Sequence, residues 1–189
     1  MKISAVLLAG GESRRMGQDK ATMLWRGRPL WQNQIDTLRK LGPTELLISA
    51  RSDPAWRPAD AVFVSDDPPF RGPLSGITAA LAAMKETHLL TLAIDMPFMS
   101  DAYLRSLCDL IKPGRGVLPV MDDRAEPLAA IYPAETRSHF VAALGGKNFS
   151  LQAITKELIQ MKTLHVVGVS REEEKFFRNV NEPGDIADL

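Results

Sequence analysis

The chain has 189 residues, of which 45% are hydrophobic and 24% charged, and its 23 Lys and Arg residues balance its 23 Asp and Glu residues. These values exclude disordered and collagen-like classes and allow one domain with a single sizeable core. No basic tract and no apolar stretch of membrane-spanning length occurs, so we expect a cytoplasmic protein without a nucleic-acid or membrane partner.

Apolar runs alternate with helical patterns through the first half of the chain. The run Ile3–Leu8 is typical of a strand that is buried on both faces. A helix is predicted to open at Pro29 and to end before Gly42. The other elements predicted here are strands over Glu45–Ser49, Ala61–Ser65 and Leu89–Ile94 and a helix that starts at Pro73.

The same alternation continues to the end of the chain. Ser100 is predicted to cap a helix, and Ser170 with Glu173 forms a capping-box pattern. The remaining predicted elements are strands over Gly116–Val120, Leu128–Tyr132 and Leu164–Val167 and helices over Pro133–Leu144 and Leu151–Gln160, the last capped by Ser150. The pattern predicts an α/β fold of one domain over residues 1–189, a Rossmann-like three-layer sandwich with a mostly parallel sheet and helices on both faces.

A glycine turn with three cations follows the first strand. Gly10 and Gly11 lack a Cβ, so the backbone can turn sharply and bring its N–H groups close to an anion. Arg14, Arg15 and Lys20 can then neutralise phosphate oxygens. The spacing fits neither a P-loop nor a dinucleotide fingerprint. The turn therefore predicts a third kind of triphosphate site; the alternative is a surface turn with solvated cations.

A carboxylate, Asp95, follows the predicted strand Leu89–Ile94. Ligands of parallel α/β sheets bind at the carboxyl ends of the strands, where this side chain is expected. Mg²⁺ prefers oxygen ligands and commonly takes one or two carboxylates together with substrate phosphates. Asp95 is thus predicted to bind a metal ion. The alternative role, capping the next turn, is already available to Ser100.

Two neighbouring carboxylates, Asp66 and Asp67, follow the predicted strand Ala61–Ser65. Gly72 and Gly76 come soon after and allow close approach of the backbone to a flat base or a ribose. The residues alone favour a simple acidic loop before a helix, and they leave open which aspartate would contact a nucleoside.

Two later segments carry candidate polar groups. Asn179 and Asn181 point to the same side if the backbone is extended, and could offer donors and acceptors to a ligand; Asn181 could equally cap a final helical turn. Glu126 lies in a segment that leads into the predicted strand Leu128–Tyr132. A simple hairpin turn explains this segment as well as a contact with a ligand does.

The glycine turn resembles the signature of the nucleotidyltransferase family that contains molybdenum cofactor guanylyltransferase. The family pattern L-A-G-G-x-S-x-R-M-G-x-D-K is met at Leu8, Ala9, Gly10, Gly11, Ser13, Arg15, Met16, Gly17, Asp19 and Lys20. Ala93–Phe98 is similar to the family's metal-binding element, and Asn179–Pro183 to its Asn-x-Asn-x-Pro element. The resemblance extends from Leu8 to Pro183 and implies a nucleotide-diphospho-sugar transferase-like fold.

This resemblance implies transfer of GMP from GTP to the terminal phosphate of a molybdopterin-type cofactor, with Mg²⁺ or alternatively Mn²⁺. Implied catalytic residues are Arg15, Lys20 and Asp95, and Asp95 is the implied metal ligand. Implied nucleotide-binding residues are Leu8, Ala9, Gly10, Gly11, Lys20, Ser49, Asp66, Gly72, Gly76 and Asp95. Asn179 and Asn181 are implied in acceptor binding, and proteins that deliver or receive the cofactor are compatible transient partners.

Three alternatives to this reaction stay open. One is transfer from CTP to the same cofactor, because the contacts that select the base are mostly main-chain contacts. Another is a different phosphorylated acceptor, such as a sugar or a phospholactate. The third is a nucleotide-binding regulatory module without turnover, against which the joint presence of Lys20, Asp95 and Asn181 argues.

Overall fold

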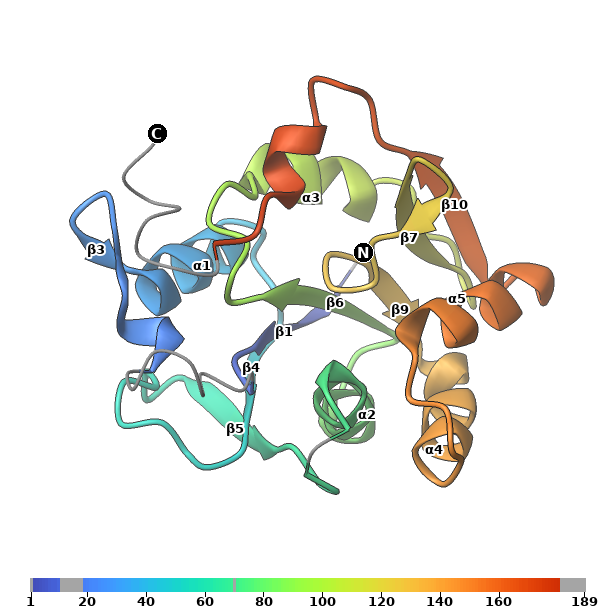
Figure 1. The fold of residues 1–189 in the computed structure, drawn as a ribbon, viewed down its shortest axis with the longest axis horizontal. Coiled ribbons are helices and arrows are strands. Elements are labelled where there is room, and N and C mark those ends of the chain that lie inside the picture. The colour runs from blue at the N-terminus through green and yellow to red at the C-terminus, as the bar shows by residue number, and fades with distance from the viewer. Residues whose placement is uncertain (1, 11–18, 70, 181–189) are drawn as a thin grey trace.

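The computed structural model describes residues 2–10, 19–69 and 71–180, which form a β-sheet between two layers of helices (Figure 1). Within these ranges the sheet has eight strands; the order is β10-β7-β9-β6-β1-β4-β5, and β8 pairs with β7. The strands are β1 (Ser4–Leu8), β4 (Glu45–Ala50), β5 (Ala61–Ser65), β6 (His88–Ala93), β7 (Gly116–Met121), β8 (Arg124–Ala125), β9 (Ile131–Pro133) and β10 (Leu164–Gly168). The predicted α/β sandwich is confirmed.

Strand β1 lies in the parallel part of the sheet. It pairs in parallel with β4 on one side and with β6 on the other, and β4 pairs in parallel with β5. Leu8, at the end of β1, is in register with Ser49 and with Ala93. The segments that follow these strands therefore leave the sheet next to one another, at the edge where α/β sheets bind ligands.

The other side of the sheet contains antiparallel pairs. Strand β9 is antiparallel to both β6 and β7, β8 is antiparallel to β7, and β10 is parallel to β7. The predicted strand Leu128–Tyr132 is wrong in its bounds, because β9 begins only at Ile131. The residues before it stay beside β6, where the carbonyls of Leu128 and Ala130 accept from the N–H groups of Ala93 and Thr91 at 3.0 and 2.9 Å. The ladder is irregular because the N–H of Ala130 donates to the side-chain oxygen of Thr91 at 3.2 Å.

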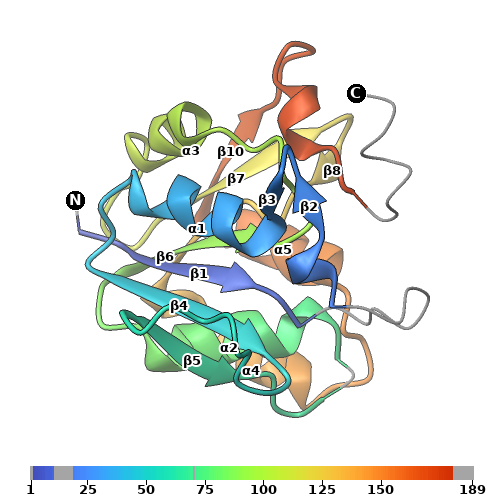
Figure 2. The ribbon, with the colours of Figure 1, turned by 90° about the vertical axis from the view of Figure 1, so that its left-hand side faces the viewer.

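Helices cover both faces of the sheet (Figures 1 and 2), and a hydrophobic core lies under them on each face. Ala5 and Leu7 of β1 belong to one core, and Val6 and Leu8 belong to the other, because successive side chains of a strand point to opposite faces. The first core is covered by α1 (Leu30–Arg39) and α3 (Asp101–Cys108), and the second by α2 (Pro73–Ala83), α4 (Arg137–Leu144) and α5 (Leu151–Gln160). None of these helices is long and apolar enough to cross a bilayer.

The helix ends follow the predicted capping chemistry in part. Ser100 Oγ accepts from the N–H of Tyr103 at 3.0 Å, which confirms this cap. Ser150 occupies the predicted cap position, but its side chain makes no capping hydrogen bond. Pro29 precedes α1 with an extended ψ of 144°, so the helix begins one residue later than predicted. Glu173 Oε2 accepts from the N–H of Ser170 at 2.8 Å, as a capping box requires.

Two 3₁₀ segments replace parts of the predicted pattern. The helix expected over Pro133–Leu144 begins as η2 (Ala134–Thr136), and α4 starts only at Arg137. The second such turn, η3 (Glu174–Phe177), follows β10. These short turns were not separable from α-helix in the sequence, because both share an apolar spacing of three to four residues.

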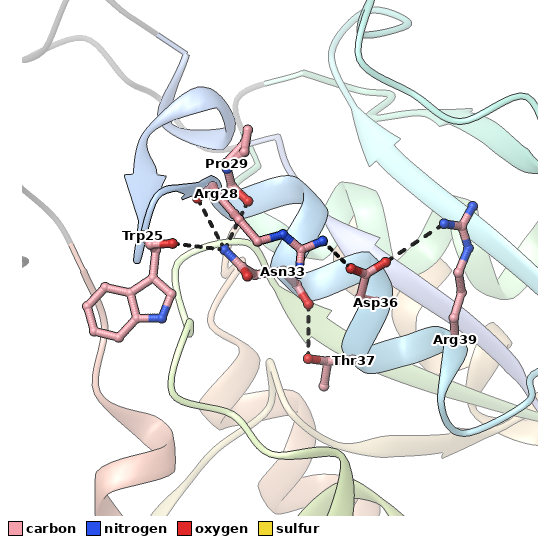
Figure 3. A network of polar contacts seen from close by, with 7 residues as sticks. All are labelled: Trp25, Arg28, Pro29, Asn33, Asp36, Thr37 and Arg39. Carbon is pink, nitrogen blue, oxygen red and sulfur yellow. Dashed lines mark hydrogen bonds and ion pairs between the residues drawn. The ribbon is translucent and has the colours of Figure 1, made fainter.

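A hairpin that the sequence analysis did not predict joins β2 (Leu24–Trp25) to β3 (Arg28–Pro29). Arg26 and Gly27 have φ values of 50° and 75°, as a two-residue hairpin turn with positive φ at both positions needs. Asn33 of α1 holds this hairpin, since its Nδ2 lies 3.1–3.3 Å from the carbonyl oxygens of Trp25, Arg28 and Pro29 (Figure 3).

Candidate active site

The candidate site lies at the carboxyl ends of β1, β4, β5 and β6. The N–H of Ala9 donates to the carbonyl of Ser49 at 2.8 Å, and the N–H of Ile94 donates to the carbonyl of Leu8 at 3.1 Å. The backbone that leaves β1 is therefore fixed between the ends of β4 and β6. Leu8, Ala9 and Gly10, which the resemblance assigned to nucleotide contact, all lie in this position.

Four predicted residues meet beside this turn. Ser49 Oγ donates to Asp66 Oδ1, and the carboxylate lies between two glycines. A Cβ on Gly10 would lie 1.6 Å from Asp66 Oδ2, and a Cβ on Gly76 would lie 2.1 Å from Ser49 Oγ. Both distances are far below any van der Waals contact. This arrangement of carboxylate and hydroxyl therefore requires glycine at both positions.

The two neighbouring aspartates, between which the sequence did not decide, have different surroundings in the structure. Asp66 is half-buried and faces the glycines, whereas Asp67 is exposed. Burial raises the pKa of the Asp66 carboxyl, while the hydrogen bond from Ser49 and the charge of Arg51 act in the opposite direction. A partly desolvated carboxylate of this kind is suited to accept hydrogen bonds from hydroxyl or amino groups of a ligand.

Gly72 lies at the start of α2, one turn before Gly76. Its φ of +60° and ψ of −150° suit glycine, which explains this residue by backbone conformation alone. Among the described residues, no heavy atom lies within 4 Å of a Cβ built at this position. The N-terminus of α2 carries the positive end of the helix dipole, which favours an anion nearby.

Lys20 and Asp95 form a direct ion pair. The distance between Lys20 Nζ and Asp95 Oδ2 is 3.1 Å, with 18% and 24% of the two side chains exposed. The residues are 75 positions apart in the chain, and the sequence prediction had placed one on phosphate and the other on metal without a contact between them. The structure brings both predicted groups to the same point of the sheet edge.

The turn that carries Lys20 is stabilised by Asp19. Its Oδ1 accepts from the N–H of Ala21 at 3.0 Å, which caps η1 (Lys20–Thr22), and its Oδ2 accepts from Trp56 Nε1 at 2.9 Å. Trp56 in turn stacks on Trp31 of α1, with ring centroids 5.5 Å apart. The sequence analysis named neither tryptophan, so their role at this site was missed.

Asp95 is suited to bind a divalent cation as a single protein ligand. Its Oδ1 is buried and has no hydrogen-bond partner among the described residues. Across those residues, no cluster of three or more His, Cys, Asp or Glu side chains has metal-binding geometry. A cation at Asp95 would therefore take its other ligands from phosphate oxygens and water, as Mg²⁺ often does.

The backbone around Asp95 is held by distant parts of the chain. The N–H of Val180 donates to the Asp95 carbonyl at 2.8 Å, so the predicted Asn-x-Asn-x-Pro element reaches the site through the residue between its two asparagines. Asn179 itself is exposed. Gln34 of α1 also contacts this turn; it was not predicted, although a polar residue on the apolar stripe between Leu30 and Leu38 was a usable signal.

Some predicted residues cannot be placed. Gly11, Arg15 and Asn181 lie outside the described residues, so their predicted roles stay predictions.

Glu126 is half-buried, and burial raises the pKa of its carboxyl. Its loop is held by Tyr132, whose hydroxyl donates to the carbonyl of Pro127 at 2.8 Å.

Comparison with known proteins relates this site to nucleotide transfer. Residues 5–162 match the family model described as MobA-like NTP transferase domain. A probable molybdenum cofactor guanylyltransferase of Opitutus terrae is 34% identical over 186 residues, which cover 97% of this chain and 92% of the relative. A molybdenum cofactor guanylyltransferase of Xanthomonas euvesicatoria pv. vesicatoria is 33% identical over 183 residues, covering 95% and 90%.

A solved structure shows the same architecture. Molybdopterin-guanine dinucleotide biosynthesis protein A of Archaeoglobus fulgidus superposes with a TM-score of 0.69 at 26% identity, covering 98% of this chain and 95% of that one. The alignment thus covers nearly the whole length of both chains. The fold expected from the sequence is confirmed by it.

Proposed function

Because the chain belongs to the family of MobA-like NTP transferase domains, we propose that it is a molybdenum cofactor guanylyltransferase. The enzyme transfers GMP from GTP to the terminal phosphate of molybdopterin cofactor. An oxygen of that phosphate attacks the α-phosphorus of GTP, the bond from this phosphorus to the bridging oxygen breaks, and pyrophosphate leaves. No covalent intermediate on the enzyme is required.

The observation that carries this proposal is the contact between Lys20 and Asp95 at the carboxyl edge of the sheet. It places a cation suited to phosphate oxygens 3.1 Å from a carboxylate suited to a metal ion. Both groups lie at the same edge of the sheet as Gly10 and Asp66, which follow β1 and β5. A nucleoside triphosphate needs this combination, because its phosphates are charged and its sugar and base carry hydrogen-bond donors.

In this reaction the protein acts by alignment and by charge stabilisation. Lys20 offsets charge on the triphosphate and on departing pyrophosphate, with Arg15 in the same role. The family's chemistry uses a divalent cation, and we propose Mg²⁺, with Mn²⁺ as an alternative, held by Asp95. When bound, such a cation neutralises phosphate charge and orients the phosphates.

We assign the nucleoside to the sheet edge beside Ser49, Asp66 and the two glycines. Its hydroxyl or amino groups would donate to the Asp66 carboxylate, which the absence of Cβ atoms at Gly10 and Gly76 allows to stay in this position. Asn179 and Asn181 are proposed to bind the acceptor, because Val180 between them is fixed on Asp95. A single domain and a cytoplasmic location stay predictions.

The test measures pyrophosphate release with GTP, CTP and ATP, with and without molybdopterin cofactor, in Mg²⁺ and in Mn²⁺. We expect release that depends on the acceptor and is fastest with GTP. Preference for CTP would make the chain a cytidylyltransferase. GTP binding without any release of pyrophosphate would favour the regulatory module instead.

A pair of variants tests the metal ligand in the same assay. Asp95→Asn keeps the shape of the side chain and should lower turnover by roughly 10²–10³-fold, by analogy with the loss of one electrostatic stabiliser. Asp101→Asn is the matched control, since Asp101 also pairs with a lysine, Lys40, at 3.3 Å, but on the surface. Activity of Asp95→Asn equal to that of the control at limiting Mg²⁺ would exclude Asp95 as a principal ligand.

A further inference from the structure

One buried amide side chain links helix α1 to the turn that carries Asp95. Gln34 is 1% exposed and lies on the apolar face of α1 with Leu30 and Leu38. Its Nε2 donates to the carbonyl oxygen of Ala93 at 3.0 Å and to that of Met96 at 2.7 Å. Both protons of the amide nitrogen are therefore used, and the cost of burying this polar group is offset by these bonds.

The two acceptors of Gln34 stand on either side of Asp95 in the chain. The local turn is weakly closed, because the N–H of Met96 lies 3.4 Å from the carbonyl oxygen of Ala93. Other bonds to the main chain of this turn come from main-chain groups, among them Val180 N–H to the Asp95 carbonyl at 2.8 Å and Ile94 N–H to the Leu8 carbonyl at 3.1 Å. Lys20 Nζ bonds to the Asp95 carboxylate itself, at 3.1 Å. Within the described residues, Gln34 is the side chain that bonds to the main-chain carbonyls of this turn.

We propose that Gln34 is a positioning residue for the metal site: by holding the carbonyls of Ala93 and Met96, it fixes the direction in which the Asp95 carboxylate points. This inference rests on the proposed function. An apolar side chain of equal size would fill the same space but would not hold the two carbonyls. The turn could then rotate, and the distance from Asp95 to a cation on the phosphates of GTP would no longer be set.

The test separates the metal-dependent part of GTP affinity from the rest. GTP is titrated calorimetrically into the wild-type chain, Gln34→Met and Gln34→Asn, in EDTA and at increasing Mg²⁺ concentration. Gln34→Met keeps length and volume but loses both donors. Gln34→Asn keeps the amide, but it is one methylene shorter and cannot reach both carbonyls.

We expect Mg²⁺ to strengthen GTP binding in the wild-type chain and this gain to fall by about tenfold in Gln34→Met, since a displacement of about 1 Å in a site can cost up to a hundredfold. GTP affinity in EDTA should stay unchanged. Gln34→Asn should show a smaller loss of the same kind, and serves as the measurement if Gln34→Met does not fold.

Thr155→Val is the matched control. Thr155 of α5 is also 1% exposed, and its hydroxyl donates to a main-chain carbonyl, that of Leu151, at 2.9 Å. This variant should lose thermal stability but keep the full gain from Mg²⁺. A full gain in both Gln34 variants would overturn the inference and leave the proposed function intact. Absence of GTP binding in the wild-type chain would overturn both.

Discussion

Replacing Lys20 by alanine removes the ammonium group that lies 3.1 Å from the Asp95 carboxylate. In the proposed reaction this group acts in two states of the protein. It neutralises Asp95 when no substrate is bound, and it offsets phosphate charge when GTP is bound. We therefore expect two effects of opposite sign: the affinity for GTP should fall, and the affinity of the substrate-free chain for Mn²⁺ alone should rise.

The size of the first effect follows from the burial of the pair. With 18% of Lys20 and 24% of Asp95 exposed, solvent screens this contact less than it screens a surface ion pair. A hydrogen bond between charged groups in such a setting contributes about 1.5–3 kcal/mol. GTP binding should weaken roughly ten- to a hundredfold, because about 1.4 kcal/mol corresponds to a factor of ten. Lys20→Arg should recover only part of this loss, since a planar guanidinium does not replace a point charge.

Lys40→Ala provides the control for this prediction. Lys40 Nζ lies 3.3 Å from Asp101 Oδ1, a contact of similar length, but 62% and 39% of the two side chains are exposed. Its removal should change stability or binding by no more than about 0.5 kcal/mol. Titration calorimetry measures GTP affinity, and electron paramagnetic resonance measures bound Mn²⁺ without nucleotide. Equal GTP affinities in the two variants would refute the phosphate role of Lys20, and weaker Mn²⁺ binding in Lys20→Ala would refute the placement of the metal at Asp95.

Two further predictions concern the proposed nucleoside site and the stability of the fold. Gly76→Ala should weaken GTP binding at least tenfold without unfolding the chain. The new Cβ would lie 2.1 Å from Ser49 Oγ, so it displaces a rotatable side chain rather than backbone. Gly145→Ala is the control: the nearest atom to its Cβ is 3.6 Å away, and it should bind GTP normally in the same titration. His88 is 1% exposed, and burial lowers its pKa below the ordinary 6.5, so the fold favours the neutral ring. Its contribution to stability is complete above pH 6.5 and is lost as the pH falls through the depressed pKa, by up to about 1.4 kcal/mol per pH unit. Urea unfolding at pH 7.5 and 5.5 should show this loss in the wild-type chain, and an equal loss in His88→Gln would contradict the assignment.

The central strands could be predicted because burial on both faces leaves a continuous apolar run. In β1 the residues from Ala5 to Leu8 alternate between the two cores, so every position is apolar and no polar face interrupts the pattern. The antiparallel strand β9 gave no such signal. It has three residues, and its preceding segment bonds to β6 irregularly, so neither length nor periodicity marks its beginning.

Part of the site could be named from the sequence by residue type, since a strand-end carboxylate and a lysine after a glycine turn are recognisable. Asp66 could be named only through the family resemblance, because the residues alone favour a simple acidic loop there. Gly10 and Gly76 were expected to bring backbone close to a ligand, whereas in the structure they make room for the Asp66 carboxylate and the Ser49 hydroxyl. The mutual arrangement of the lysine and the strand-end carboxylate was not recognisable, because Lys20 and Asp95 are 75 residues apart and only the folded sheet brings them into contact.

The groups that hold the site in place are harder to recognise, for a physical reason. Gln34 lies on the apolar stripe of its helix, and a buried amide there indicates that some acceptor lies opposite. Its acceptors are main-chain carbonyls 59 and 62 residues away, and every residue has a carbonyl. No residue type marks these partners in the sequence. The contact depends on where α1 packs relative to the end of β6. A change at Gln34 therefore alters Asp95 through geometry alone, which is why its effect should be visible in the metal dependence of GTP binding and absent when metal is withheld.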